Sequence, residues 1–210
     1  MKQILAFGDS NTWGMIPGTT PPARYAWGKR WTSILQERLS DVRVIEEGLC
    51  GRTTVFEDEL RPDRRGIDAL PLLLESHSPL DAVILMLGTN DCKSYFHASP
   101  YIIGKGIESC LDIIEKKVDI SKVLLVSPLH LGEEVWKPEM DPEFSKESII
   151  VSQNLKNIYQ KIALKKGCQF LAASDYVNPS SVDNEHMDAD SHEIFANAII
   201  DKLTELGLSD

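Results

Sequence analysis

The sequence predicts a three-layer α/β/α fold, in which a parallel sheet of five strands lies between two layers of helices. Short apolar segments alternate with segments of helical periodicity along the chain, and segment 81–87 is apolar at almost every position. Such alternation is typical of parallel sheets, whose central strands are covered on both faces. No internal repeat, low-complexity tract or linker interrupts the alternation, so we expect one domain over residues 1–210.

Each expected element has a signal of its own. The strand segments are short and apolar, whereas the helical segments carry apolar residues three and four positions apart. We expect strands at 4–7, 42–45, 81–87, 122–128 and 168–172, and helices at 29–39, 67–74, 102–114, 147–164 and 191–206. Segments 14–27 and 130–145 contain several prolines and are predicted to be long loops, which are often functional.

Composition excludes several classes of partner. The chain has 210 residues and a formal net charge of −10, so nucleic acid and anionic membranes would repel it. No segment approaches the ~18 consecutive apolar residues of a membrane span, and no secretory leader is visible. The cysteines are widely spaced and predict neither a disulfide framework nor a zinc site; they are Cys50, Cys92, Cys110 and Cys168. We therefore expect a cytoplasmic protein with reduced thiols.

The end of the first strand is the first candidate site. The apolar run 4–7 stops at Gly8 and is followed by Asp9, Ser10 and Asn11, each of which suits a helix N-cap. Ligands of open α/β sheets bind beyond the carboxyl ends of the strands, so Ser10 is expected at a site. A serine nucleophile needs a base, an acid that orients the base, and hydrogen-bond donors for the oxyanion.

Two later strand ends offer such donors. Gly51 lies in the turn after the second strand and can present its backbone N–H to a ligand. Asn90 follows Gly88 after the most apolar strand, and its side-chain amide can donate without carrying charge. Each residue also has a plain structural interpretation, a turn glycine and an Asx-turn.

The base and its orienting acid are expected in the loop before the last helix. Asp183 and His186 are three residues apart, so the carboxylate can accept from one imidazole nitrogen while the other faces Ser10. A rival interpretation is a divalent metal site formed by His186, His192 and the nearby aspartates, although it lacks a recognised ligand spacing. A third is an acidic loop that caps the final helix.

Aromatic residues bracket the first long loop. Trp13 and Trp27 either line an acyl pocket or pack as ordinary core residues, and the sequence leaves both open. We take Asp9, Trp13 and Trp27 as candidate pocket residues.

Taken together and in order, these segments resemble the sequence blocks of the GDSL, or SGNH, hydrolase family. Residues 7–10 match the first block, Gly51 the glycine of the second, residues 88–91 the third, and Asp183 with His186 the last, DxxH. The resemblance implies a flavodoxin-like SGNH hydrolase fold. It also implies that Ser10 is the nucleophile, that His186 and Asp183 are its catalytic partners, and that Ser10, Gly51 and Asn90 form the oxyanion hole.

Within the family, the chain is similar to the bacterial arylesterase and acyltransferase group that can perform perhydrolysis. Segments 8–14, 30–32, 44–54 and 86–91 carry this similarity. It implies a small ester substrate with a short acyl chain, a site shaped by Trp13, and a homo-oligomer. The chain departs from the group at Asn184 and Glu185, because a glycine usually follows the aspartate.

The resulting hypothesis is a serine esterase that works through an acyl-enzyme, with acyl transfer or perhydrolysis as a further activity. It needs no metal and no cofactor. One alternative is a carbohydrate O-deacetylase, which uses the same chemistry on another leaving group. Another is a non-catalytic, flavodoxin-like module that binds a small ligand at its strand-end loops.

Overall fold

The computed structural model describes residues 1–208, and its centre is a sheet of five parallel strands in the order β2-β1-β3-β4-β5. The strands are β1 (Lys2–Gly8), β2 (Val42–Gly48), β3 (Ala82–Met86), β4 (Val123–Ser127) and β5 (Gln169–Ala172). This order is flavodoxin-like, and the direction in which strands are added reverses beside β1. The α/β fold with five parallel strands is the one predicted.

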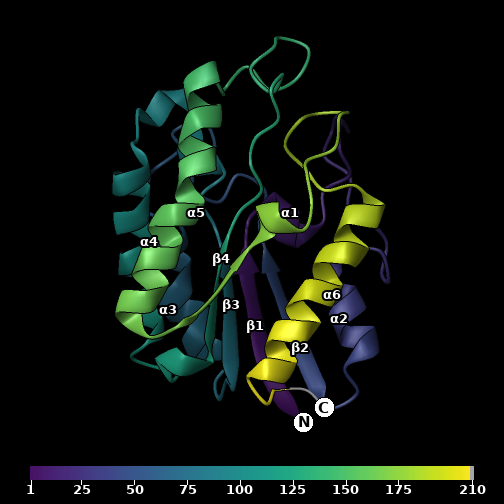
Figure 1. Ribbon diagram of the computed structural model, residues 1–210, viewed down its shortest axis with the longest axis vertical. Helices are drawn as coiled ribbons and strands as arrows, with labels where there is room; N and C mark the ends of the chain where they lie inside the picture. The colour runs from purple at the N-terminus through teal and green to yellow at the C-terminus, as the bar shows by residue number, and fades with distance from the viewer. Residues whose placement is uncertain (209–210) are drawn as a thin grey trace.

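Helices cover both faces of the sheet (Figure 1). One layer contains α3 (Gly66–Ser76), α4 (Pro100–Ile114) and α5 (Lys146–Lys166), and the other contains α2 (Trp31–Arg38) and α6 (Ala189–Glu205). The short helices are α1 (Ser10–Trp13), η1 (Asn90–Cys92), η2 (Ser94–Phe96), η3 (Ile120–Lys122) and η4 (Ala173–Asp175).

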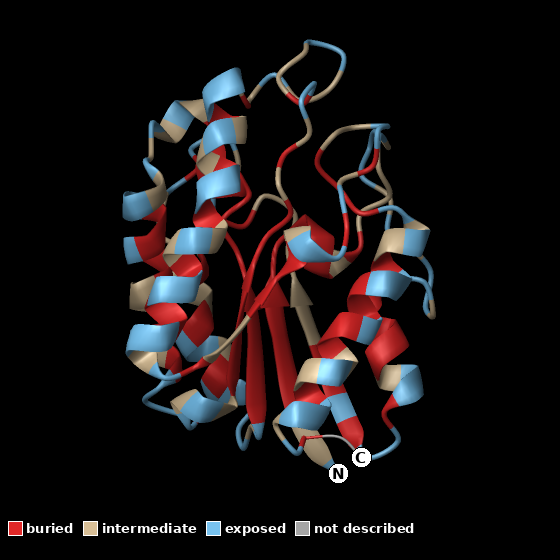
Figure 2. Cartoon of the chain, in the orientation of Figure 1, coloured by how far each residue is buried: buried red, intermediate tan, exposed pale blue. Residues whose placement is uncertain are grey.

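The apolar strands contribute side chains to two hydrophobic cores, one on each face of the sheet. In β1, Leu5 and Phe7 belong to the core under α3, α4 and α5, whereas Ile4 and Ala6 belong to the core under α2 and α6. Successive side chains of a strand point to opposite faces, so a strand covered on both sides must be apolar at every position. Figure 2 shows β1 and β3 buried over nearly their whole length.

The second strand is longer than predicted. The sequence indicates 42–45, but β2 continues through Glu46 and Glu47 to Gly48, because these residues pair in register with Ala6, Phe7 and Gly8 of β1. β2 is an edge strand and its last residues are half-buried, so the apolar pattern ends before the backbone pairing does.

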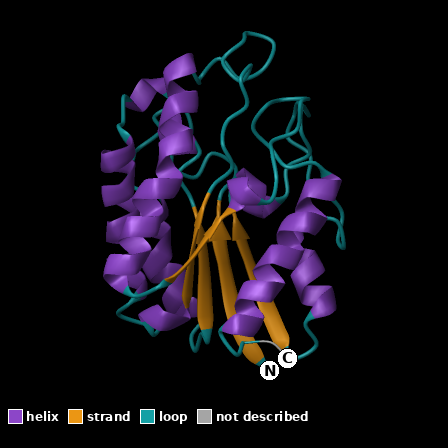
Figure 3. Cartoon of the chain, viewed as in Figure 1, coloured by secondary structure: helices purple, strands orange, loops and turns teal. Residues whose placement is uncertain are grey.

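All five strands run in the same direction, so their carboxyl ends share one edge of the sheet. The loops that follow β1, β2 and β3 gather there, above the arrowheads in Figure 3, and the N-terminus and the end of α6 lie at the opposite edge. Loop 14–27 folds on itself through a bridge between Met15 and Arg24. Within residues 1–208, no helix combines the length and apolar character needed to cross a membrane.

Candidate active site

The turn after β1 brings Ser10 to the edge where the loops gather. At Gly8, an added Cβ would lie 2.1 Å from the Thr12 hydroxyl and 2.7 Å from the carbonyl oxygen of Met86. Glycine is therefore needed here because helix α1 folds back closely on the strand. Asp9 caps α1 by accepting the N–H of Asn11 at 3.0 Å, so Ser10 is the first residue of the helix.

The hydroxyl of Ser10, the imidazole of His186 and the carboxylate of Asp183 form a hydrogen-bonded series. Nε2 of His186 lies 2.9 Å from Oγ of Ser10, and Nδ1 lies 2.8 Å from Oδ2 of Asp183. The structure thus brings the Ser10 hydroxyl to an imidazole that lies 176 positions away in the sequence. When the imidazole is neutral with its proton on Nδ1, Nε2 can accept the hydroxyl proton.

The carboxylate of Asp183 is held by its own loop. Oδ1 accepts the N–H groups of Glu185 and His186, both at 3.0 Å, and Oδ2 also accepts the N–H of Gly18 at 3.0 Å. Asn184 completes the turn with φ of 61°, a conformation that asparagine tolerates better than most residues. Burial raises the pKa of Asp183, but the hydrogen bond and charge of His186 and the backbone N–H groups outweigh burial and lower the pKa.

The side chain of Asn11 also joins this loop to helix α1. Oδ1 of Asn11 accepts the N–H of Met187 at 2.9 Å, and Nδ2 donates to the carbonyl oxygen of Glu185 at 3.4 Å. The carbonyl oxygen of Asn11 accepts from the Trp31 indole at 3.1 Å. Asn11 thus holds both neighbours of His186. The sequence indicated Asn11 only as a possible cap, and its place directly after Ser10 was the available signal.

The proposed oxyanion donors come from three strand ends. Ser10 is the first residue of α1, so its N–H has no partner within the helix. Gly51 has φ of 81°, and its N–H has no hydrogen-bond acceptor within residues 1–208. Nδ2 of Asn90 donates to the carbonyl oxygen of Arg52 at 3.1 Å, which leaves its second N–H available. All three residues line one cavity.

Two buried charged residues fix the loop that carries Gly51. The guanidinium of Arg52 donates to the carbonyl oxygens of Gly8, at 2.9 Å, and Glu47, and lies 4.2 Å from the centre of the Phe7 ring. Asp91 accepts the backbone N–H of Thr54 at 3.0 and 3.1 Å and also its hydroxyl. Burial raises the pKa of Asp91 to about 6. Sequence reasoning placed both residues in segments similar to the family but assigned neither a role, because each acts through contacts between strand ends.

The cavity beside Ser10 has a volume of about 400 Å³, and most of the residues that line it are polar or charged. Its lining includes Ser10 and His186, Gly51 and Asn90, the charged residues Arg61, Arg64, Lys93, Asp141 and Glu185, and Met15, Pro22 and Cys50. Loop 14–27 therefore does contribute to the cavity, but through Met15 and Pro22 and not through its aromatic residues.

The three candidate pocket residues lie elsewhere. Trp27 is 55% exposed and packs against the guanidinium of Arg30, 5.3 Å from the ring centre, and Trp13 packs similarly against Arg24 at 5.5 Å. Asp9 is fully buried beneath α1. None of the three belongs to the cavity wall: one arginine packs against each tryptophan ring, and Asp9 serves as the helix cap.

Glu185 adds a second carboxylate beside the imidazole. Its Oε1 lies 3.8 Å from Nε2 of His186, and its side chain is buried. Burial lowers the pKa of His186, but the charges of Glu185 and Asp183 outweigh burial and raise this pKa to about 9. Sequence reasoning singled out Glu185 only as a departure from the family pattern.

His192, which the metal-site interpretation requires as a ligand, has a structural role. Its Nδ1 accepts the backbone N–H of Trp31 at 3.3 Å, and burial lowers its pKa to about 4. His186 is hydrogen-bonded to Asp183 and Ser10. Within residues 1–208, no group of three or more His, Cys, Asp or Glu side chains is arranged to hold a metal ion.

The site contains a hydroxyl, an imidazole and a carboxylate in series, beside free N–H donors at the edge of a parallel sheet. This arrangement is typical of serine hydrolases. Residues 6–197 match the sequence model of the GDSL-like lipase/acylhydrolase family. The chain belongs to this family, and it is a carboxylic ester hydrolase. No curated protein matches the sequence significantly.

Solved structures agree with this assignment. The aryl esterase of M. smegmatis is 33% identical, with a TM-score of 0.90 over 98% of this chain and 100% of that one. Est24, a carbohydrate acetylesterase from Sinorhizobium meliloti, is 36% identical, with a TM-score of 0.89 over the same shares. A lipase/acylhydrolase from Enterococcus faecalis, 19% identical with a TM-score of 0.69 over 100% of this chain and 98% of that one, shares the fold.

Proposed function

We propose that the enzyme hydrolyses small esters with short acyl chains, and that Ser10 is its nucleophile. His186 takes the Ser10 proton as Oγ attacks the ester carbonyl, and Asp183 holds the imidazole in the required tautomer and stabilises the imidazolium. His186 then protonates the leaving alcohol. Water, activated by the same imidazole, attacks the acyl-enzyme and releases the acid.

The oxyanion of each tetrahedral intermediate is stabilised by the N–H groups of Ser10 and Gly51 and by the side-chain amide of Asn90. Donors that are already oriented cost no reorganisation as the charge develops. The backbone geometry supports this role, since Gly51 has an unused N–H and Asn90 retains one N–H beyond its bond to Arg52.

The observation that carries the proposal is the unbroken series from Oγ of Ser10 through both imidazole nitrogens to Asp183, with distances of 2.9 and 2.8 Å. The cavity beside this series, with a volume of about 400 Å³, offers room for a small ester. Similarity to the aryl esterase of M. smegmatis also favours small ester substrates.

The test compares the wild type with Ser10→Ala. We expect the wild type to hydrolyse p-nitrophenyl acetate fastest within a series from acetate to octanoate, and to be labelled by a fluorescent organophosphonate. Ser10→Ala should lose labelling and at least about 10⁴-fold of kcat, while its circular dichroism and Tm stay unchanged. A wild type that releases no product from any ester in the series would contradict the proposal and favour a binding module.

A second candidate is O-deacetylation of carbohydrates. Two observations favour it: five charged side chains line the cavity, and the Sinorhizobium meliloti carbohydrate acetylesterase is 36% identical. Sugar hydroxyls need many hydrogen-bond partners, which a charged wall offers. Acetate release from acetylated xylose and glucose, compared with release from p-nitrophenyl acetate, tests this candidate.

We also propose that the chain forms a homo-oligomer. Several large apolar side chains are more than half exposed, among them Leu60, Leu72, Tyr95, Tyr101 and Leu164. A second copy of the chain would bury part of this surface. Size-exclusion chromatography with light scattering distinguishes a monomer from an oligomer.

The proposed location is the cytoplasm. All four cysteines are free thiols, which is typical of a reducing compartment. Immunodetection in fractionated cells tests this location.

A further inference from the structure

Glu185 lies in the active site, yet the proposed mechanism leaves its side chain unused. It is 7% exposed, and its side chain lines the same cavity as Ser10 and His186. Its backbone is anchored on both sides, because its N–H donates to Asp183 and its carbonyl oxygen accepts from Asn11. The backbone anchors limit how far the carboxylate can move away from the imidazole.

The carboxylate has no hydrogen-bond donor of its own. Oε1 lies 3.8 Å from Nε2 of His186, which is beyond hydrogen-bond distance, and no other group within residues 1–208 donates to either side-chain oxygen. Glu185 lines the cavity, so solvent reaches its carboxylate until a substrate binds, and an acceptor that the bound substrate then leaves without a donor is unfavourable. Accordingly, burial raises the pKa of Glu185 to about 7. A donor from the substrate would relieve this cost.

The three cations of the cavity wall have other partners, and Arg64 donates to the carbonyl oxygens of Cys50 at 3.0 Å and Pro62 at 2.9 Å. Lys93 pairs with Glu143 at 2.8 Å and with Asp58 at 3.4 Å, and Arg61 pairs with Glu143 at 2.6 Å. Glu185 is thus the buried carboxylate of the cavity wall that remains available to a bound molecule.

The position of Glu185 determines which portion of the substrate its carboxylate can contact. Nε2 of His186 delivers a proton to the leaving oxygen, so this oxygen must lie within hydrogen-bond distance of Nε2. Oε1 of Glu185 lies 3.8 Å from the same nitrogen. A hydroxyl on the carbon next to the one that bears the leaving oxygen therefore comes within range of the carboxylate, and a hydroxyl can donate to it.

We propose that Glu185 binds a hydroxyl group on the alcohol portion of the substrate, so that the enzyme prefers partial esters of polyols or sugars to esters of simple alkyl alcohols. This inference rests on the proposed function and names its substrate class. An alkyl group at the same position would leave the carboxylate desolvated and without a donor. The site thus discriminates against an alkyl ester, because this substrate leaves the buried carboxylate unpaired. Such a penalty rejects an analogue that lacks the hydroxyl strongly.

The first experiment needs no variant. The substrates are 2-hydroxyethyl acetate, 2-methoxyethyl acetate, in which a methyl group replaces the donor hydrogen, and propyl acetate, in which a methyl group replaces the hydroxyl. At pH 8, we expect kcat/KM of the wild type to be about tenfold or more higher for 2-hydroxyethyl acetate than for either analogue. Equal values for the three substrates would overturn the inference.

The second experiment assigns the preference to Glu185. The quantity compared is kcat/KM for 2-hydroxyethyl acetate divided by kcat/KM for propyl acetate. This ratio should fall to within about twofold of unity in Glu185→Leu. In Glu185→Gln, which keeps an acceptor oxygen, it should take an intermediate value. Because each ratio is measured within one variant, any effect on His186 cancels. An unchanged ratio in Glu185→Leu would overturn the inference, and the wild-type comparison remains decisive if this variant does not fold.

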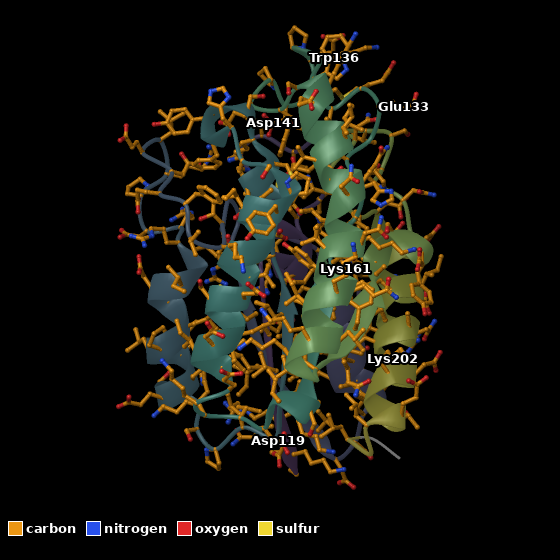
Figure 4. The ribbon with its side chains drawn as sticks, turned by 60° about the vertical axis from the view of Figure 1, so that its left-hand side comes forward. Asp119, Glu133, Trp136, Asp141, Lys161 and Lys202 are labelled. Atoms are coloured by element: carbon orange, nitrogen blue, oxygen red, sulfur yellow. The ribbon has the colours of Figure 1, made fainter. Side chains whose placement is uncertain are left out.

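The matched control is Glu133→Gln. Glu133 is exposed and lies at the same end of the molecule as the cavity residue Asp141, whereas Asp119 marks the opposite end (Figure 4). Glu133→Gln removes one negative charge outside the cavity and should retain the wild-type ratio. Failure of the wild type on p-nitrophenyl acetate would instead contradict the proposed function, so the two failures are distinguishable.

Discussion

The two sides of the proposed active site are built in different ways. On the acid–base side, Asp183 and His186 belong to one short loop, and two N–H groups of that loop donate to the carboxylate. On the oxyanion side, Ser10, Gly51 and Asn90 follow three different strands that are adjacent in the sheet. The first side is a local motif that spacing alone can predict, whereas the second exists only after the sheet has formed.

The two sides also differ in what holds them. Buried contacts of Arg52 and Asp91 connect the strand-end loops on the oxyanion side. The acid–base loop is connected to α1 through Asn11. We therefore expect changes in the acid–base loop to alter chemistry, and changes in the connecting residues to alter stability as well.

The largest difference is expected for Asp183→Asn. The amide cannot hold the imidazole in the productive tautomer or stabilise the imidazolium, so kcat should fall about 10³- to 10⁴-fold. Tm should change little, because the asparagine carbonyl still accepts backbone N–H groups. The exposed neighbour Asp190, changed to asparagine, serves as control and should retain full activity. Full activity of Asp183→Asn would remove Asp183 from the proposed triad.

A smaller loss is expected on the oxyanion side for Asn90→Ala. Removing one oxyanion donor typically costs about 10²- to 10³-fold in kcat. The loss should appear in kcat and much less in KM, because the contact forms as charge develops. If kcat were unchanged while Tm dropped, Asn90 would be a structural residue that only holds Arg52.

The pH profile tests how Glu185 acts on the acid–base side. His186 must be neutral to accept a proton, and the carboxylates beside it raise its pKa to about 9, so kcat/KM should rise with pH through this pKa. Glu185→Gln removes one of these negative charges, so the pKa of His186 should fall and the acid limb of the profile should move to lower pH. On that limb, kcat/KM of the variant at a fixed pH should exceed the wild-type value, by about tenfold if the midpoint moves by a full pH unit. A limb that stays in place in Glu185→Gln would mean that Glu185 does not act on the imidazole.

The smallest catalytic effect is expected for Asn11→Ala, at about fivefold or less in kcat. This change leaves the N–H of Met187 without its acceptor, and the free energy of unfolding should fall by about 1–3 kcal/mol. Asn11→Asp keeps the acceptor oxygen and should lose less. Urea denaturation followed by fluorescence measures both variants; equal stability of Asn11→Ala and the wild type would contradict the connecting role.

Sequence reasoning predicted the elements that depend on local pattern. The periodicity of α5, the apolar run of β3 and the fold class all depend on neighbouring residues. The family assignment was predicted as well, and the family model confirms it. The pocket residues were not predictable in the same way: the packing of Arg24 against Trp13 and of Arg30 against Trp27 depends on how loop 14–27 folds.

By itself, the sequence determined the order of strands and helices along the chain and the three-residue spacing of Asp183 and His186. It also determined which side chains can act as nucleophile, base, acid or hydrogen-bond donor. Only the tertiary structure decided that Gly51 and Asn90 face the same cavity as Ser10, that Glu185 is buried beside the imidazole, and that Asn11 joins the two sides. The physical reason is that spacing along the chain controls contacts within one turn or loop. Contacts between strand ends depend on the order of strands in the sheet and on which buried groups find partners.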